Sequence, residues 1–202
     1  MHLFLGILLA GAPLLCVEII ARWRHIEGEA TRKTTHVLSS LAVIALTGFC
    51  SLHQVALIGG LFLGAMLALR HRRLWHSLYR VERTSWGEVS FPAGVLASGL
   101  LADTRFQFIV AMLVLGLADT AASLAGKRFG RRKLPVVTHK SYIGSLVCFV
   151  SSYLIIVIAT TRPLAALVIA GGVTIAEAFT SLGLDNVLIP VIAILIMRLL
   201  NL

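Results

Sequence analysis

The sequence predicts an all-α fold, a polytopic membrane helical bundle of about seven to eight transmembrane helices. Hydrophobic residues make up 58% of the 202 residues and charged residues only 13%. The mean hydropathy is +0.92, far above that of an ordinary soluble domain. The apolar runs approach bilayer length, and the charges gather between them. We expect residues 1–202 to form a single integral-membrane domain.

The hydropathy pattern predicts eight helices, several of them short for a membrane span. The first follows no cationic segment and ends at "RWRH", as a retained helix does. The tight turns "SLH", "DTR" and "TRP" separate later helices and predict antiparallel neighbours. The predicted helices are 3–21, 36–50, 54–69, 89–103, 106–125, 143–160, 163–181 and 186–200.

The distribution of cations predicts the orientation. All but three of the 18 Lys and Arg residues lie in or beside the first, third and fifth loops; the exceptions are Arg105, Arg162 and Arg198. The positive-inside rule therefore places these three loops in the cytoplasm and both termini outside. Taken singly, each basic run is explained as a stop-transfer signal and lipid anchor. The sequence lacks a soluble module and aromatic residues interleaved with the cations, so no nucleic-acid partner is expected.

Polar residues at the predicted cytoplasmic ends of the helices indicate a polar cleft at that face. Ionisable groups near apolar helices are costly and normally face a bundle interior or a watery cavity. The alternative for each residue is a helix cap or a structural ion pair, and it is weakest for Asp119, which has apolar neighbours on both sides. The residues are Glu29, Arg32, Lys33, His36, Glu88, Asp119, Lys140, Ser141, Glu177, Asp185 and Asn186.

The stretch "LADTAASLAGKRFGRRK" (117–133) places Asp119 on a face of small residues at helical spacing, which a helix or a ligand can approach closely. A cluster of cations follows and leads into "KSYIGS" (140–145), where Lys140, Ser141 and helix-start N–H groups could bind an anion. It is not a Walker A loop, because it lacks the required glycine and hydroxyl residue. A carboxylate beside phosphate-binding groups suggests a divalent cation.

Five motifs together resemble the CTP-dependent lipid kinases, a group with dolichol kinase, phytol kinase and CTP-dependent diacylglycerol kinase that is distantly similar to phosphatidate cytidylyltransferases. They occur in the right order over most of the chain: "EGEATRKTTH" (27–36), "RTSWGEVSFP" (83–92), "ADTAASLAGKRFGRRK" (118–133), "KSYIGS" (140–145) and "EAFTSLGLDNVLIP" (177–190). The resemblance implies a single lipid kinase domain that uses Mg²⁺. It would transfer the γ-phosphoryl group of a nucleoside triphosphate, typically CTP, to a membrane lipid alcohol such as a polyprenol, phytol or diacylglycerol.

The family resemblance and the cation cluster together predict the site residues. The catalytic candidates, any of which could be the general base, are Asp119, Glu88 and His36. The candidate metal ligands are Asp119, Asp185 and Glu177. The candidates for nucleotide or phosphate binding are Arg32, Lys33, Lys127, Arg128, Gly130, Lys140, Ser141, Gly144 and Ser145. Two further polar residues are assigned to the site, Asn186 and Glu29.

Two departures refine these expectations. Dolichol kinases tend to carry Glu where Ile143 stands, which favours the phytol or diacylglycerol branch. A second "LADT" (101–104) puts Asp103 on the outer turn, where it is expected to be inert.

A cytidylyltransferase, in which a lipid phosphate attacks the α-phosphorus of CTP, is an alternative activity. A small transporter is another, but its polar groups would lie near the bilayer midplane. The sequence leaves the oligomeric state open.

Overall fold

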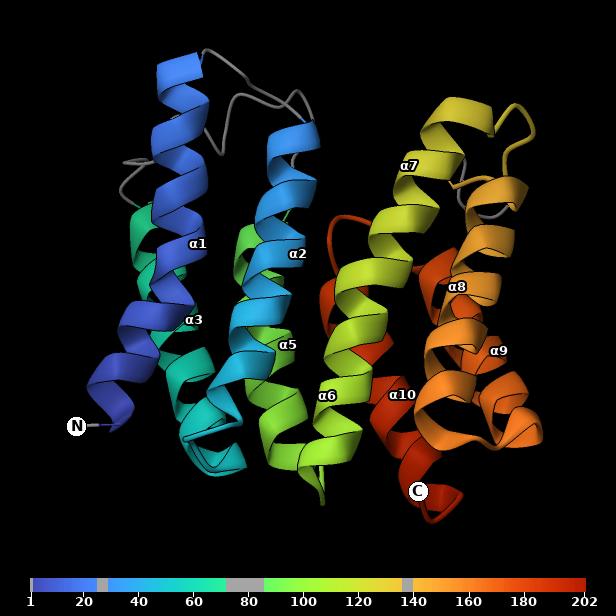
Figure 1. Ribbon diagram of the computed structural model, residues 1–202. Coiled ribbons are helices and arrows are strands. Elements are labelled where there is room, and N and C mark those ends of the chain that lie inside the picture. Colours follow the sequence, from blue (N-terminus) through green and yellow to red (C-terminus); the bar gives the residue numbers. More distant parts are fainter. Residues whose placement is uncertain (1, 25–28, 72–85, 136–139) are drawn as a thin grey trace.

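The computed structural model describes residues 2–24, 29–71, 86–135 and 140–202, which are almost entirely helical (Figure 1). Its elements are α1 (His2–Arg24), α2 (Glu29–Leu46), α3 (Leu52–His71), α5 (Gly87–Leu101), α6 (Arg105–Leu113), the π-helix η1 (Val114–Ala118), α7 (Asp119–Phe129), α8 (Tyr142–Thr160), α9 (Pro163–Phe179) and α10 (Asp185–Leu199). The elements α6, η1 and α7 form one continuous rod. The predicted all-α membrane bundle is therefore confirmed.

The helices stand in two rows (Figure 1). One row contains α1, α2, the α6–η1–α7 rod and α8, and the other contains α3, α5, α10 and α9. Among the residues that the structure describes, three helices are long and apolar enough to cross a membrane: α3, the continuous α6–η1–α7 helix and α8. Shorter apolar helices lie at Leu3–Val17, Gly87–Leu101 and Pro163–Phe179. How many helices cross the bilayer stays a prediction.

Each predicted span corresponds to a helix in the described part of the chain, and the largest difference concerns α2. This helix was expected at 36–50, but it runs from Glu29 to Leu46. Its first two turns are rich in polar residues, which hydropathy assigns to a loop. Those turns are nevertheless helical, and Lys33 is buried on them. Arg32, Lys33 and His36 therefore share one helix and not a loop and a helix.

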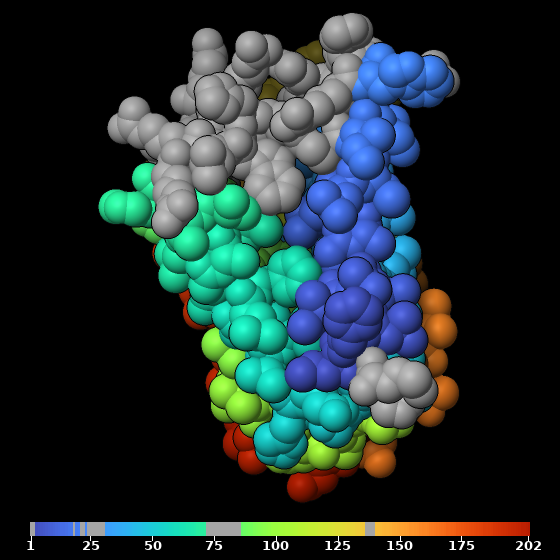
Figure 2. All heavy atoms as spheres, turned by 90° about the vertical axis from the view of Figure 1, so that its left-hand side faces the viewer, coloured from blue at the N-terminus to red at the C-terminus, as the bar shows by residue number. Residues whose placement is uncertain are grey.

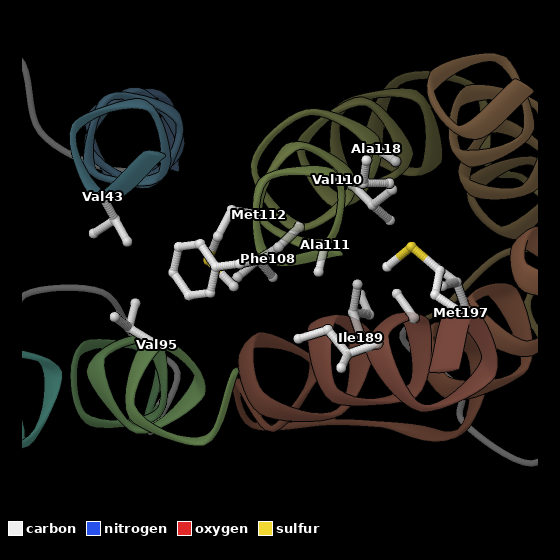
Figure 3. Packing of buried hydrophobic residues seen from close by; sticks show 14 of the residues in the cluster. Val43, Val95, Phe108, Val110, Ala111, Met112, Ala118, Ile189 and Met197 are labelled. Carbon is white, nitrogen blue, oxygen red and sulfur yellow. The ribbon is translucent and has the colours of Figure 1, made fainter. Parts of the chain in front are cut away.

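The hydrophobic core surrounds the α6–η1–α7 rod. Phe108 and Met112 of α6 are completely buried, and Figure 3 shows them beside Val43 of α2, with Ile189 and Met197 of α10 packed across from α6. Thr104 caps α6 by accepting a hydrogen bond from the backbone N–H of Gln107. The rod thus fixes the position of α7, which carries Asp119, relative to α2 and α10.

The two ends of the bundle differ in chemistry. Both chain termini lie at one end, and the ends of α1, α3 and α7 that adjoin the basic segments lie at the other (Figure 1). At the terminal end, exposed Asp103 forms an ion pair with Arg198, with 2.7 Å between Oδ2 and Nε. Asp103 is therefore far from the polar site described below, as expected for the second "LADT".

Candidate active site

A cavity of about 640 Å³ opens between the helices, with a polar part and an apolar part. The polar part is formed by the start of α2, the start of α5, α7, the start of α8 and the facing ends of α9 and α10. The apolar part continues among α1, α2, α3 and α5. The volume of the whole cavity lies within the range of small-molecule sites, about 300–1,000 Å³.

Asp119 lies at the centre of the polar part and is 4% exposed. It follows the π-helix η1 directly, ten residues before the end of α7 at Phe129, or about 15 Å along the helix. Its Oδ2 accepts a hydrogen bond from Lys33 Nζ at 2.7 Å, although the two residues are 86 positions apart. Lys33 is also buried, so each charge compensates for the loss of water around the other.

His36 lies one turn beyond Lys33 on α2, with its Nε2 3.9 Å from Asp119 Oδ2. The same nitrogen is 3.1 Å from the backbone carbonyl oxygen of Leu115 in η1. A carbonyl oxygen only accepts, so Nε2 carries the proton in this contact and Nδ1 is left as the basic nitrogen. The His36 ring meets Phe91 edge to face, with centroids 5.3 Å apart. These contacts hold the imidazole at the edge of the polar part.

A second ion-pair cluster surrounds Lys140. Its Nζ lies 2.5 Å from Glu177 Oε1 and 3.5 Å from Asp185 Oδ2. Ser145 donates a hydrogen bond to Glu177 Oε2 at 3.1 Å and so fixes that carboxylate. Burial lowers the pKa of Lys140, but the carboxylates of Asp185 and Glu177 raise it by more, so the pKa lies above its usual value. Lys140 is therefore a cation at neutral pH.

Three glycines bring the start of α8 against α7. A Cβ on Gly126 would lie 2.9 Å from Ser141 Oγ and 3.4 Å from Gly144 Cα, and a Cβ on Gly130 would overlap the side chain of Ser141. Ser141 Oγ accepts from the backbone N–H of Gly144 at 3.1 Å and caps α8. The close packing of α7 and α8 therefore depends on these small residues. This packing places Lys140, just before α8, at the cavity.

The start of α5 supplies a third polar group. Glu88 forms an ion pair with Arg70 at the end of α3, and the Arg70 guanidinium also lies 3.9 Å from the centre of the Trp86 ring. Asn186 of α10 donates from Nδ2 to the Gly87 carbonyl oxygen at 3.2 Å and lies 3.4 Å from Ser90 Oγ. The amide therefore joins α10 to α5 beside the cavity.

The structure brings most of the predicted site residues to this one cavity. Those that line it are Arg32, Lys33, His36, Glu88, Asp119, Lys127, Lys140, Ser141, Gly144, Glu177, Asp185 and Asn186. Three predicted residues, Arg128, Gly130 and Ser145, do not line it. Ser145 and Gly130 act on its walls through the contacts above, and Arg128 is exposed, 5.5 Å from the Phe129 ring. The side chain of Glu29 lies outside the part that the structure describes.

Arg70, Lys133 and Phe91 also line the cavity. Sequence reasoning placed Lys133 in the cation cluster without naming it a site residue, and it assigned no site role to Arg70 and Phe91. The two cations belong to basic runs whose members look alike in the sequence, and Phe91 belongs to an apolar run. Arg70 differs from its neighbouring cations only in the folded protein, where helix packing places it in an ion pair with Glu88.

The cavity carboxylates could supply only part of the ligands of a magnesium ion. Within the described residues, no three His, Cys, Asp or Glu side chains gather closely enough to form a metal site by themselves. Mg²⁺ commonly takes one or two protein carboxylates and completes its shell with water and phosphate oxygens. Asp119, Asp185 and Glu177 line the same cavity, so they could supply such ligands.

Comparison with known proteins shows that this chain is similar to a curated lipid kinase. Phytol kinase from Synechocystis sp. is 30% identical over 196 residues, which cover 89% of this chain and 83% of the relative. No protein-family model matches the sequence, and no solved structure matches it.

Proposed function

This chain belongs to the same lipid kinase family as the phytol kinase of Synechocystis sp., and on that premise we propose that it transfers the γ-phosphoryl group of CTP to the hydroxyl of a membrane lipid alcohol. Among the polyprenol, phytol and diacylglycerol classes, the relative's name favours phytol or a similar isoprenoid alcohol. We further propose that the polar part of the cavity faces the cytoplasm, where CTP is available.

The observation that carries this proposal is the joining of two lysine–carboxylate clusters in one cavity. Lys33 pairs with Asp119, and Lys140 pairs with Glu177 and Asp185. Lysines bind phosphate oxygens, and carboxylates bind a metal or accept a proton, so the two clusters supply the groups that phosphoryl transfer requires.

In the proposed reaction, the alcohol oxygen forms a bond to the γ-phosphorus while the bond from that phosphorus to the β-phosphate oxygen breaks. The hydroxyl proton passes to a base, and CDP leaves. Lys140 and Lys33 would hold phosphate oxygens and turn away from their carboxylates to do so. Catalysis is then mostly positioning and neutralisation of charge, as in other phosphoryl transfers.

Asp119, with Asp185 or Glu177, would hold the magnesium ion of the nucleotide. When bound, the ion would supply positive charge that offsets the negative charge developing on the phosphates. The carboxylates face lysines in the structure, and a bound metal would take over that compensation of charge when the lysines turn to the phosphates. Asn186 and the Gly126–Gly144 contact would keep α10, α7 and α8 at the spacing that this arrangement needs.

The general base has three candidates. Glu88 is engaged by Arg70, and His36 has only Nδ1 left to take a proton. Asp119 is the most central of the three, but metal binding would occupy its oxygens. The pH dependence of turnover in Glu88→Gln and His36→Asn would distinguish them. Removal of the general base abolishes the fall in turnover at low pH, whereas loss of a positioning contact lowers turnover at every pH and keeps the shape of the profile.

The proposal is tested with the purified protein in nanodiscs, γ-labelled CTP, ATP, UTP or GTP, and phytol, farnesol, a longer polyprenol or diacylglycerol. We expect Mg²⁺-dependent incorporation of the γ label into an isoprenoid alcohol, with CTP as the best donor. A parallel reaction with α-labelled CTP and phosphatidate tests the alternative activity. Label from the α-phosphate in the lipid, with release of pyrophosphate, would identify a cytidylyltransferase and overturn the kinase proposal.

A further inference from the structure

The apolar part of the cavity has no role in the phosphoryl transfer described above. Beyond His36 the walls change from charged to apolar side chains contributed by α1, α2, α3 and α5. We call this part the apolar arm. Its principal lining residues are Leu14, Val43, Phe62, Met66, Phe91 and Val95.

The apolar arm has defined walls. The edge-to-face contact of His36 with Phe91 marks its junction with the polar part. At the far end, the ring of buried Phe108 points toward the space between Val43 and Val95 (Figure 3). On the outer side, α1 and α3 lie side by side (Figure 2). The arm therefore runs inside the bundle, between the two rows of helices.

The length of the arm suits a hydrocarbon chain. Val43 lies seven residues beyond His36 on α2, and Val95 lies seven beyond Glu88 on α5, so each wall extends about 10 Å from the polar part. The wall formed by α3 belongs to a helix long and apolar enough to cross a membrane. An apolar space continuous with a polar site is complementary to a molecule with a polar head and an apolar chain.

Ser39 provides a second observation at the junction. It lies on α2 between His36 and Val43, lines the cavity and is 5% exposed. Among the described residues, its Oγ has no hydrogen-bond partner. A buried hydroxyl without a partner is costly, and the oxygen of an alcohol located at the junction would supply one. The head of the ligand would thus lie near His36 and Ser39, with its chain directed toward Val43.

We propose that the apolar arm binds the hydrocarbon chain of the lipid alcohol, with the hydroxyl at the junction near His36 and Asp119. The inference rests on the proposed function for the identity of the alcohol. It goes further because it assigns the chain a binding site inside the protein, whereas the reaction alone would allow the chain to stay in the surrounding lipid. The arm then selects among alcohols by the shape of the chain nearest the hydroxyl.

Kinetics of two phenylalanine variants test this assignment. Val43→Phe narrows the arm, and we expect the KM for the alcohol to rise about tenfold or more, the usual range for a change of bulk in a hydrophobic pocket. The KM for CTP should not change. Leu41→Phe is the matched control, because Leu41 is two residues away on the same helix and 45% exposed on the outer surface. Equal KM values for the alcohol in both variants would overturn the proposal.

Photo-crosslinking of the unmodified protein tests the same site without relying on turnover or on the folding of a variant. The probe is an isoprenoid alcohol with a diazirine at the middle of its chain, and mass spectrometry locates the adduct. We expect labelling at Val43, Phe62 or Val95 that excess phytol suppresses. Labelling confined to outer positions such as Leu41 would show that the hydrocarbon chain does not bind in the apolar arm, even if γ-label transfer is observed. Labelling of the apolar arm without any transfer would support the arm as the binding site of the chain and refute the kinase activity.

Discussion

The Asp119–Lys33 ion pair allows a structural role to be separated from a catalytic one. Asp119→Asn preserves the size of the side chain but leaves the ammonium of Lys33, which is 6% exposed, without its anion. Removing one member of a buried pair typically costs about 3–5 kcal/mol of unfolding free energy. In the double variant Asp119→Asn/Lys33→Met both charges are absent, and we expect most of that loss to be recovered, since neutral replacement of a buried pair is often close to neutral in stability.

Activity should respond differently from stability. If Asp119 holds the metal of the nucleotide and Lys33 holds a phosphate oxygen, the folded double variant should still turn over at least about 100- to 1,000-fold more slowly than the unmodified protein, equivalent to about 3–4 kcal/mol or more of lost transition-state stabilisation. The control is Asp103→Asn, which removes an exposed ion pair with Arg198 and should change stability by less than about 1 kcal/mol. Its activity should be normal.

The assay combines thermal unfolding in detergent, size-exclusion chromatography and γ-label transfer as a function of Mg²⁺ concentration, each on the folded fraction. Comparison of the two single variants with the double variant gives the coupling energy of the pair. Recovery of both stability and turnover in the double variant would refute the metal-ligand role, because it would show that Asp119 acts only through Lys33.

Three further outcomes are expected. Lys140→Ala should raise the KM for CTP about tenfold or more, because charge-assisted contacts contribute about 1.5–3 kcal/mol. The control Arg162→Ala, on the turn at the other end of the bundle, should leave this KM unchanged. Equally small effects of the two variants would mean that Lys140 only helps to set the orientation of the chain in the membrane. Gly126→Ala should lower the melting temperature by overpacking the contact with α8, while Gly64→Ala, whose Cβ would meet nothing within 4 Å, should not; similar shifts would contradict the close contact. A cysteine at exposed position Arg132 should react with an impermeant reagent only from the cytosolic side, and reaction from outside would reverse the proposed orientation.

The positions of the helices were predictable because hydropathy reports burial in lipid directly. Turns such as "SLH" and "TRP" therefore located α3 and α9 to within a few residues. The start of α2 was not predictable in this way. Its first two turns carry Arg32, Lys33 and His36, and their polarity reflects the cavity that they line and not an exposed loop.

The polar residues of the site were also recognisable, but their pairing was not. Motifs identified Asp119 and Lys33 separately, whereas their contact joins residues 86 positions apart and depends on how α2 meets the central rod. The same limit applies to Arg70, whose partner Glu88 lies on the neighbouring helix. Ser145 is a further case, since the motif could not reveal that it donates to Glu177; its role in phosphate binding stays a prediction.

The π-helix η1 has a consequence for chain length in this family. A π turn is an α-helix that has absorbed one extra residue, and each residue of an α-helix advances about 100° around its axis. If the 25 residues Arg105–Phe129 formed an uninterrupted α-helix, Asp119 would be rotated by about that angle relative to Phe108, and either the carboxylate or the core side chain would point elsewhere. Relatives that lack one residue within 114–118 can therefore keep both faces in register, although the carbonyl that meets His36 would change. A single-residue gap within 109–113, between Phe108 and the π-helix, would instead rotate the carboxylate away from the cavity.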